Sequence, residues 1–238
     1  MEPVTRRRPG PRRALSEEEI LDAALGLLDE GGPTAASVRG IAAKVGVAPN
    51  AVYTYFEDKA AVFQALIERL LGQVDHGVFA DPEQPWRDRV ESLAVELRGR
   101  LTAHPGAVSI MVGGPVNGPN ARALHERLLE LFADAGLSTA DAARAAYLLI
   151  VYVFGSMALE IADLQQAGLL PPESDRVATR QRTLAATPAD QYPRSAAAAD
   201  VMATYISTEQ YLWGLHRLLD AVTASAARNP QPGSGVAD

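Results

Sequence analysis

Apolar side chains recur at steps of three and four residues along most of the chain, which is the spacing of amphipathic α-helices. No stretch shows the strict alternation of apolar and polar residues that is typical of a half-buried strand. The pattern therefore predicts an all-α protein. The helices are expected at about 16–30, in two short pieces within 37–59, and at 58–75, 85–103, 105–112, 119–135, 139–166 and 207–226, with a short helix near 175–184.

The stretch 37–59 predicts two short helices joined by a tight turn. Ser37 can cap the first helix, and Gly46 permits the left-handed backbone that a sharp helix end needs. Pro49 suits the first turn of the second helix, because it has no N–H group to leave unpaired. Val52 then faces inward while polar side chains face outward. This is the pattern of a helix-turn-helix, whose second helix can enter the major groove of DNA.

A longer helix precedes this motif and another follows it. Ser16 and Glu19 have the spacing of a capping box, and the Gly-Gly-Pro run at 31–33 is a stop signal for that helix. Asp58 can cap the helix at 58–75. Its broad apolar stripe lets one end contact the motif and the other end contact a second domain.

Breaks in the helical pattern divide the chain into parts. Residues 1–14 are rich in Arg, Pro and Gly and are expected to be disordered, either as a basic arm that contacts DNA or as a solvated leader. A helix-turn-helix unit is expected at 15–62 and a larger helical unit at 76–227. The proline-rich segment 167–200 reads as a long connection, and 228–238 as a disordered tail.

Composition adds constraints on the partners and the compartment. The 238 residues are 47% hydrophobic and carry a net charge of −7, yet five arginines lie within the first 13 residues. An acidic body with one basic end suits a protein that touches DNA only at that end. The longest apolar run, Ala145–Leu159, is shorter than the roughly 20 residues of a membrane span. With no secretory signal, we expect no membrane association and a cytoplasmic location, at the nucleoid when bound to DNA.

The segment from about 16 to 63 resembles the DNA-binding domain of the TetR family of bacterial transcriptional repressors. The C-terminal part resembles the ligand domain of the tetracycline repressor branch, through Tyr152–Glu160 and Tyr211–Leu215. The residues that carry the N-terminal resemblance are Ile20-Leu21-Asp22-Ala23-Ala24, Ser37-Val38-Arg39, Ile41-Ala42, Gly46-Val47, Val52-Tyr53-Thr54-Tyr55-Phe56 and Asp58-Lys59.

The resemblance implies a homodimer in which a three-helix helix-turn-helix domain binds an inverted-repeat DNA operator. A larger helical domain would bind a small, largely apolar effector that releases the repressor, and would dimerise through helices near 139–166 and 207–226. Arg and Lys can neutralise phosphate, Tyr can donate to it, and Asn can read adenine. The DNA-contacting positions of the family carry over to Ser37, Arg39, Pro49, Asn50, Ala51, Tyr53, Tyr55 and Lys59.

Candidate ligand contacts lie on the helices around the presumed pocket. Such pockets need apolar walls with a few polar groups, and methionines are adaptable fillers. The alternative for most apolar residues of helix 139–166 is the core or a dimer seam. The candidates are His104, Met111, Tyr147, Tyr152 and Met157.

Other kinds of site find little support in the sequence. The four histidines are scattered without ligand spacing, and cysteine is absent, so no metal site or cofactor is expected. The tetracycline branch chelates drug-bound magnesium with a histidine, which the corresponding stretch 107–115 lacks. No Gly-rich phosphate loop, HExxH motif or serine elbow indicates an enzyme. A helical protein-interaction module remains the alternative to a DNA-binding regulator.

Overall fold

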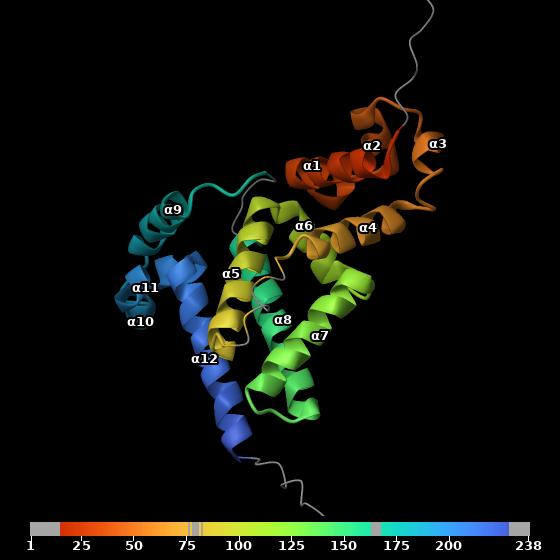
Figure 1. The fold of residues 1–238 in the computed structure, drawn as a ribbon. Helices are drawn as coiled ribbons and strands as arrows, with labels where there is room; N and C mark the ends of the chain where they lie inside the picture. The colour runs from red at the N-terminus through yellow and green to blue at the C-terminus, as the bar shows by residue number, and fades with distance from the viewer. Residues whose placement is uncertain (1–14, 76, 78–80, 82, 163–167, 229–238) are drawn as a thin grey trace, which may run out of the picture.

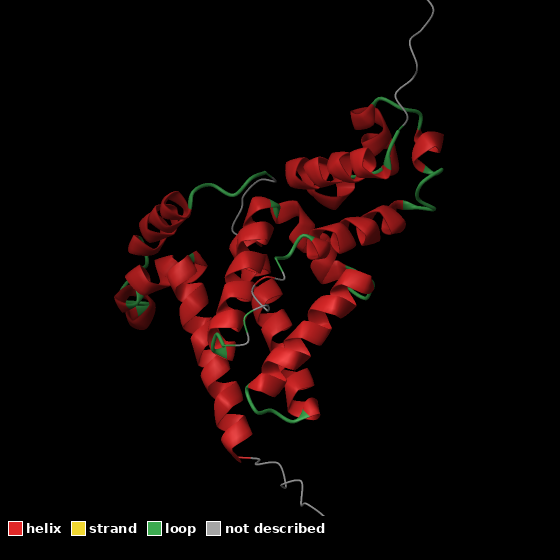
Figure 2. Ribbon diagram, viewed as in Figure 1, coloured by secondary structure: helices red, strands yellow, loops and turns green. Residues whose placement is uncertain are grey.

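The computed structural model describes residues 15–75, 77, 81, 83–162 and 168–228, and the regular secondary structure within them is entirely helical (Figure 2). The all-α prediction is therefore confirmed. The predicted arm at 1–14 and nearly all of the predicted tail at 228–238 lie outside the described residues. Figure 1 shows a small helical unit at the N-terminal end, joined through one helix to a larger bundle.

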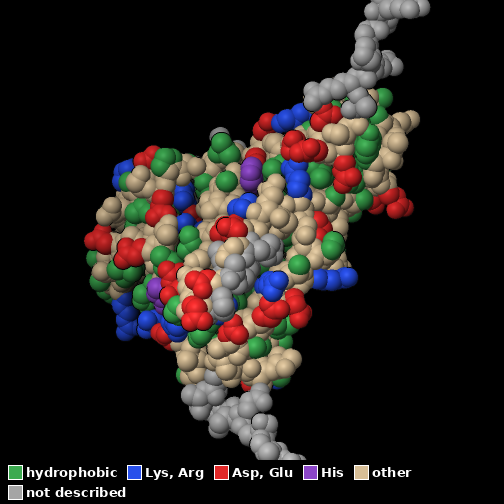
Figure 3. All heavy atoms as spheres, viewed as in Figure 1, with side chains coloured by type: hydrophobic (Ala, Val, Ile, Leu, Met, Phe, Trp, Pro, Cys, Tyr) green, Lys and Arg blue, Asp and Glu red, His purple; other side chains and the backbone are tan. Residues whose placement is uncertain are grey.

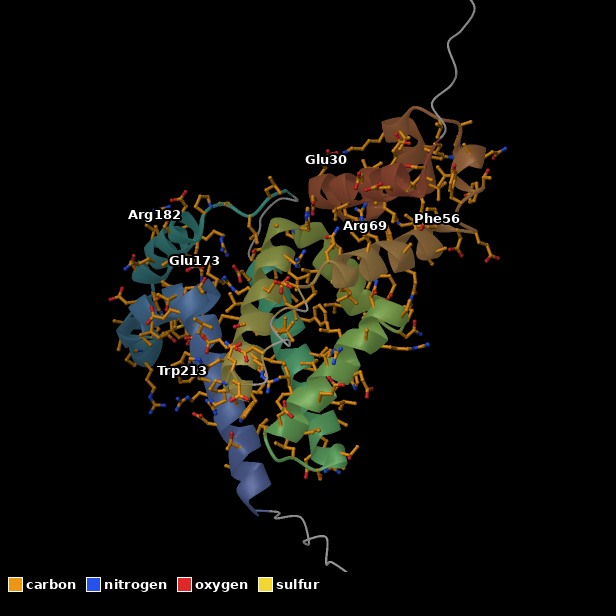
Figure 4. The ribbon with its side chains drawn as sticks, viewed as in Figure 1. Glu30, Phe56, Arg69, Glu173, Arg182 and Trp213 are labelled. Carbon is orange, nitrogen blue, oxygen red and sulfur yellow. The ribbon has the colours of Figure 1, made fainter. Side chains whose placement is uncertain are left out.

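The N-terminal unit packs three helices around a shared apolar core. Ile20, Ile41 and Val52 are fully buried, one from each helix. Phe56 also points inward, just beyond the third helix (Figure 4). The three helices are α1 (Glu17–Ala35), α2 (Val38–Val45) and α3 (Pro49–Val52).

Local capping explains where α1 begins, and two glycines explain where its first part ends. The Ser16 hydroxyl accepts from the backbone N–H of Glu19 at 3.2 Å, and the Glu19 carboxylate accepts from the N–H of Ser16 at 3.1 Å. The helix is interrupted at the predicted place, because the backbone of Gly31 and Gly32 is not helical, and a short second piece then runs to Ala35. Gly32 has a φ of +67°, which glycine tolerates, so the chain changes direction between the two helical pieces.

Helix α4 (Lys59–Gly72) connects the two units. Asp58 caps it, as predicted, by accepting from the N–H of Ala61 at 2.8 Å. Val62 and Leu66 are fully buried on its apolar side. The helix packs against α1 of the N-terminal unit and against α6 and α7 of the bundle.

The larger bundle surrounds α8, which packs against α5, α6, α7 and α12. By length and composition, α8 could cross a membrane, with a mean hydropathy of 1.9 and a third of that window buried. Its buried side contacts four helices and includes Glu160 in an ion-pair cluster, which is typical of a core helix. The helices are α5 (Trp86–Ala103), α6 (Pro105–Gly113), α7 (Pro119–Asp134), α8 (Thr139–Ala162) and α12 (Thr208–Arg228).

A helical arm occupies most of the segment that was expected to be a connection. The predicted short helix is confirmed as α9. Residues 168–172 and 186–192 are not helical, as predicted, but the prediction of a loop is wrong from Pro193 onward, where two further short helices form. Pro193 explains the error, because it stands at the first position of a helix, where its missing N–H costs nothing. The arm comprises α9 (Glu173–Ala185), α10 (Pro193–Ala197), α11 (Ala199–Ala203) and the 3-10 turn η2 (Thr204–Ile206), beside α12 in Figure 1.

Candidate functional site

The helix-turn-helix presents a short exposed helix on a buried support. The Ser37 hydroxyl accepts from the N–H of Gly40 at 3.1 Å, and Gly46 ends α2 with a φ of +82°. Val52 anchors α3 in the core, while Asn50 and Tyr53 are exposed. No side chain caps the start of α3, where Ala48 stands. The arrangement displays α3 outward without burying its polar side.

The predicted DNA contacts fall into two groups by their present partners. Three of them are engaged within the protein: Ser37 caps α2, the Tyr55 hydroxyl donates to the carbonyl of Leu15, and the Lys59 amine donates to the carbonyl of Pro33. The other five lie on or beside the outer side of the motif, and no side-chain bond joins them to another described residue. They are Arg39, Pro49, Asn50, Ala51 and Tyr53.

A cavity of about 680 Å³ opens within the bundle, in the size range of small-molecule sites. Helices α4 to α8 all contribute to its walls. Leu71 brings α4 into the lining, so the cavity touches the helix that leads to the DNA-binding unit. Most of its lining is apolar: Leu71, Leu93, Leu97, Met111, Val112, Val116, Ala121, Leu124, Leu128, Leu149, Ile150, Val151, Val153, Phe154 and Ala158.

The predicted ligand residues are divided between this cavity and other places. Met111 and Tyr147 line it. His104 lies beside a smaller void of about 20 Å³, which shares Met111 with the cavity. Tyr152 does not line either space, because its hydroxyl donates to the carbonyl of Tyr211 at 2.5 Å. Met157 is fully buried in the core and likewise lies outside the lining.

Polar groups of the cavity come from a part of the chain that the sequence reading passed over. Asn117 precedes α7, and Arg122 and His125 lie on α7 one turn apart. The i, i+3 spacing places both on neighbouring positions of the helix surface. The sequence signal for these two residues is their spacing on a helix that is predicted next to the pocket.

Two sets of contacts tie the cavity region to the DNA-binding unit. From α1, the Asp29 carboxylate lies 2.9 Å from Nδ1 of His104 and accepts from the N–H of Gly106 at 3.1 Å. A Cβ on Gly106 would lie 2.3 Å from the Leu28 backbone, so α6 and α1 are in direct backbone contact.

The second set runs from α4 to α7. The Glu68 carboxylate accepts from the backbone N–H groups of Asn120 and Ala121, at 2.7 and 3.4 Å. These N–H groups belong to the first turn of α7, so a side chain of α4 caps that helix. Gln64 of α4 donates to the Asn117 side chain at 3.0 Å. Figure 4 shows Arg69 between α4 and α1, where it pairs with Asp22 at 2.7 Å.

A buried ion cluster fastens the helical arm to the bundle. Arg98 of α5 pairs with Glu160 at 3.0 Å and with Glu173 at 3.3 Å, and donates to Thr208 at 2.8 Å. Burial raises the pKa of Glu173, but hydrogen bonds from Thr208 and the charge of Arg98 outweigh it and lower the pKa overall. Figure 4 shows Glu173 at the start of α9, on the side of α12.

The described residues offer no constellation for a metal. Among them, no group of three or more His, Asp or Glu side chains converges on a common point. On the visible face in Figure 3, acidic and basic side chains are interspersed. The described residues therefore form a helical bundle that encloses a cavity and is joined to a helix-turn-helix.

Comparison with known proteins matches both units. Residues 20–66 match the model described as bacterial regulatory proteins, tetR family, and residues 79–225 match the tetracyclin repressor-like C-terminal domain. An HTH-type transcriptional regulator of Saccharopolyspora erythraea is 32% identical over 146 residues. That match covers 61% of this chain and 61% of the relative, so the chain spans less than two thirds of the relative's length.

Solved structures share the whole arrangement. A possible TetR family transcriptional regulator from Streptomyces coelicolor is 30% identical with a TM-score of 0.76, over 88% of this chain and all of that one. ActR of Streptomyces coelicolor in complex with actinorhodin shares the fold, with a TM-score of 0.73 at 22% identity over 90% and 99% of the two chains. With both family models matched and the fold shared, this chain belongs to the TetR family of DNA-binding transcriptional regulators.

Proposed function

We propose that the chain is a ligand-responsive repressor that binds an inverted-repeat operator as a homodimer and is released by a small, largely apolar effector. The observation that carries the proposal is the 680 Å³ cavity, whose lining includes Leu71 of α4. The actinorhodin complex of ActR supports it, because a protein of this fold binds a small molecule. In this proposal the protein is cytoplasmic, has no catalytic activity and needs no cofactor.

The DNA-binding surface is proposed to be the outer side of the helix-turn-helix unit at 15–62. Arg39 and Lys59 would neutralise phosphates, and Tyr53, which is 51% exposed, would donate to a phosphate oxygen. Asn50 would read a base edge. Ser37, Pro49, Ala51 and Tyr55 complete the proposed surface, and for Tyr55 and Lys59 binding would exchange a carbonyl partner for a phosphate.

The dimer is proposed to form through α8 and α12 of the unit at 76–227. Four exposed apolar residues lie on one side of α8 at steps of one, three and eight residues, and the exposed Gly155 fills the longest step. Trp213 of α12 is also 59% exposed and projects from its helix (Figure 4). In a two-fold symmetric dimer, each protomer would cover this surface of its partner with the same patch. The stripe consists of Tyr147, Leu148, Val151 and Leu159.

The proposed effector site uses the lining of the large cavity. Met111 and Tyr147 remain in it from the sequence-based set, and Asn117, Arg122 and His125 join them. His104 is left out of the proposed effector site, because it bonds Asp29 of α1 and lines only the smaller void. Tyr152 and Met157 are excluded from the site because neither lines the cavity.

Release would follow from the coupling of the cavity to α4 and α1. An effector shifts the protein between two forms only through a difference in affinity for them. A ligand that displaces the start of α7 would also displace Glu68 and Gln64, which bond Asn120 and Asn117 there. Both side chains belong to α4, the helix that follows α3. The two recognition helices would then no longer match successive major grooves, about 34–36 Å apart.

The test begins with site selection from a random DNA library, followed by titration of the selected duplex. We expect an inverted repeat, and a complex that contains two protomers per site. Effector candidates are then screened for release of that duplex. Failure to enrich any sequence would contradict the DNA-reading proposal, and release by no apolar compound would contradict the effector proposal.

A further inference from the structure

The charge of the cavity lining contrasts with the charge of the protein. The chain has 29 acidic and 22 basic residues, yet none of the residues that line the cavity is Asp or Glu. Arg122 is the one lining residue, among those described, that is always charged at neutral pH. His125 lies beside it on α7 and offers an imidazole ring that can form a hydrogen bond. The cavity of an acidic protein is thus electropositive.

No partner among the described residues accounts for the position of the Arg122 side chain. Other arginines of the bundle pair with carboxylates, such as Arg127 of the same helix, which lies 2.7 Å from Glu130. Within the described part of the chain, the Arg122 and His125 side chains form no hydrogen bond or ion pair. Glu126 follows Arg122 by four residues and does not pair with it either. The guanidinium therefore keeps its donors available at the cavity.

We propose that the effector is an organic anion: an apolar body held by the cavity walls, with one acidic group paired to Arg122 and assisted by His125. The proposal rests on the proposed effector site and names its ligand class. Guanidinium groups bind carboxylate and related oxyanions with two parallel hydrogen bonds, which gives orientation as well as affinity. A cationic ligand would instead meet like charge in a lining without any carboxylate.

The position of Arg122 limits the expected size of the effect. The side chain is exposed to solvent, so its charge is partly screened. Replacing it should weaken an anionic ligand roughly five- to tenfold, between the effects of an exposed pair and of a charged hydrogen bond. A neutral ligand of the same shape should lose less than about twofold, because its affinity comes from the apolar walls.

Two fluorescent probes separate charge from shape. Anilinonaphthalene sulfonate carries an anionic group, and N-phenyl-naphthylamine has the same ring system without it. Titration of each into the full-length protein, Arg122→Gln and Arg127→Gln gives their affinities. We expect only Arg122→Gln to weaken the sulfonate probe, with the neutral probe unchanged in every variant. Arg127→Gln is the matched control, because it removes a cation from the same helix away from the cavity.

Cavity-filling variants locate the probes. Ala121→Phe and Ala158→Phe should each displace both probes, because both alanines line the cavity. Unchanged sulfonate affinity in Arg122→Gln, equal loss of both probes, or probes that persist in both filled variants would overturn the ligand class. Operator binding without any probe is measured in parallel. It should persist in Arg122→Gln, so a failed charge prediction remains distinct from a failed regulator proposal.

Discussion

The carboxylate of Asp29 lies 2.9 Å from the imidazole of His104 and joins the first helix of the chain to the start of α6. The same carboxylate accepts from the N–H of Gly106, so one acidic side chain of α1 holds two groups at the helix start. Met111 lies further along α6 and lines the large cavity. The helix is thus attached to the DNA-binding unit at one end and exposed to the proposed effector at the other.

Replacing Asp29 by Ala should weaken this attachment. We expect a loss of about 1 kcal/mol in the free energy of unfolding, or about 2–4 °C in Tm, because a charged hydrogen bond and a cap are removed. The response of operator binding to an effector should also diminish. Thermal unfolding and gel shifts measure the two effects. Glu30→Ala is the control, since its pair with Lys44 lies on the surface and contributes little.

Gly106→Ala should disturb the contact between α1 and α6 directly. The added Cβ would lie 2.3 Å from the Leu28 backbone, and such overpacking costs about 1–3 kcal/mol. Gly99→Ala is the opposite case, because nothing lies within 4 Å of its Cβ and alanine favours a helix. Denaturant titration of both variants should show opposite signs. Equal stability of the two would contradict the close approach of the helices.

Arg39→Ala should reduce operator affinity and the dependence of that affinity on salt. A residue that neutralises one phosphate contributes about one unit to the slope of log affinity against log salt. Asn50→Ala should leave this slope unchanged and relax the preferred sequence, since it is proposed to read a base. Gel shifts at several salt concentrations and repeated site selection distinguish the two roles. Identical behaviour of the two variants would argue against the assignment.

Leu159→Glu should convert the dimer to monomers. Leu159 is 74% exposed in the apolar stripe of α8, and a carboxylate there would be buried without a partner in the dimer. Leu169 is 72% exposed but lies outside the stripe, so Leu169→Glu serves as a control of equal exposure. Sedimentation velocity reports the masses. A dimer that survives Leu159→Glu would place the interface elsewhere.

Acid should loosen the helical arm before the bundle unfolds. The folded state lowers the pKa of Glu173 below its ordinary value of 4.5, so its stabilising contribution is present above that pH. The contribution is lost as the pH falls through the lowered value, when the carboxylate no longer accepts from Thr208 or pairs with Arg98. Hydrogen exchange of α9 amides against pH measures this. Glu173→Gln should have a more mobile arm near pH 7 and a weaker acid dependence.

Local signals made the N-terminal unit predictable, because its caps and turn depend on neighbours in sequence such as Ser37 and Gly46. The cavity was less predictable because it depends on helix rotation. Tyr147 and Tyr152 both lie on α8, but five residues turn a helix by about 140° beyond a full turn. One side chain therefore reaches the cavity, while the other bonds Tyr211.

The arm and its ion cluster were beyond sequence reasoning for another reason. Arg98 meets Glu160 and Thr208 across separations of 62 and 110 residues, and no local pattern marks such partners. The prolines of this segment also resemble loop signals, although Pro193 in fact begins a helix. The arm could not be predicted because its ion pairs join distant parts of the sequence, and because proline occurs both in loops and at the first position of helices.

Because Glu68 caps α7, the charge of the proposed effector would act on the contact between α7 and α4. The start of a helix has a partial positive charge, which the Glu68 carboxylate now neutralises. An anionic effector paired to Arg122 would bring a second negative charge to the same first turns of α7. The two anions would repel, and Glu68 is the one attached to α4. A neutral molecule of identical shape would fill the cavity without this repulsion, so occupancy and release of DNA would become separable properties of a ligand.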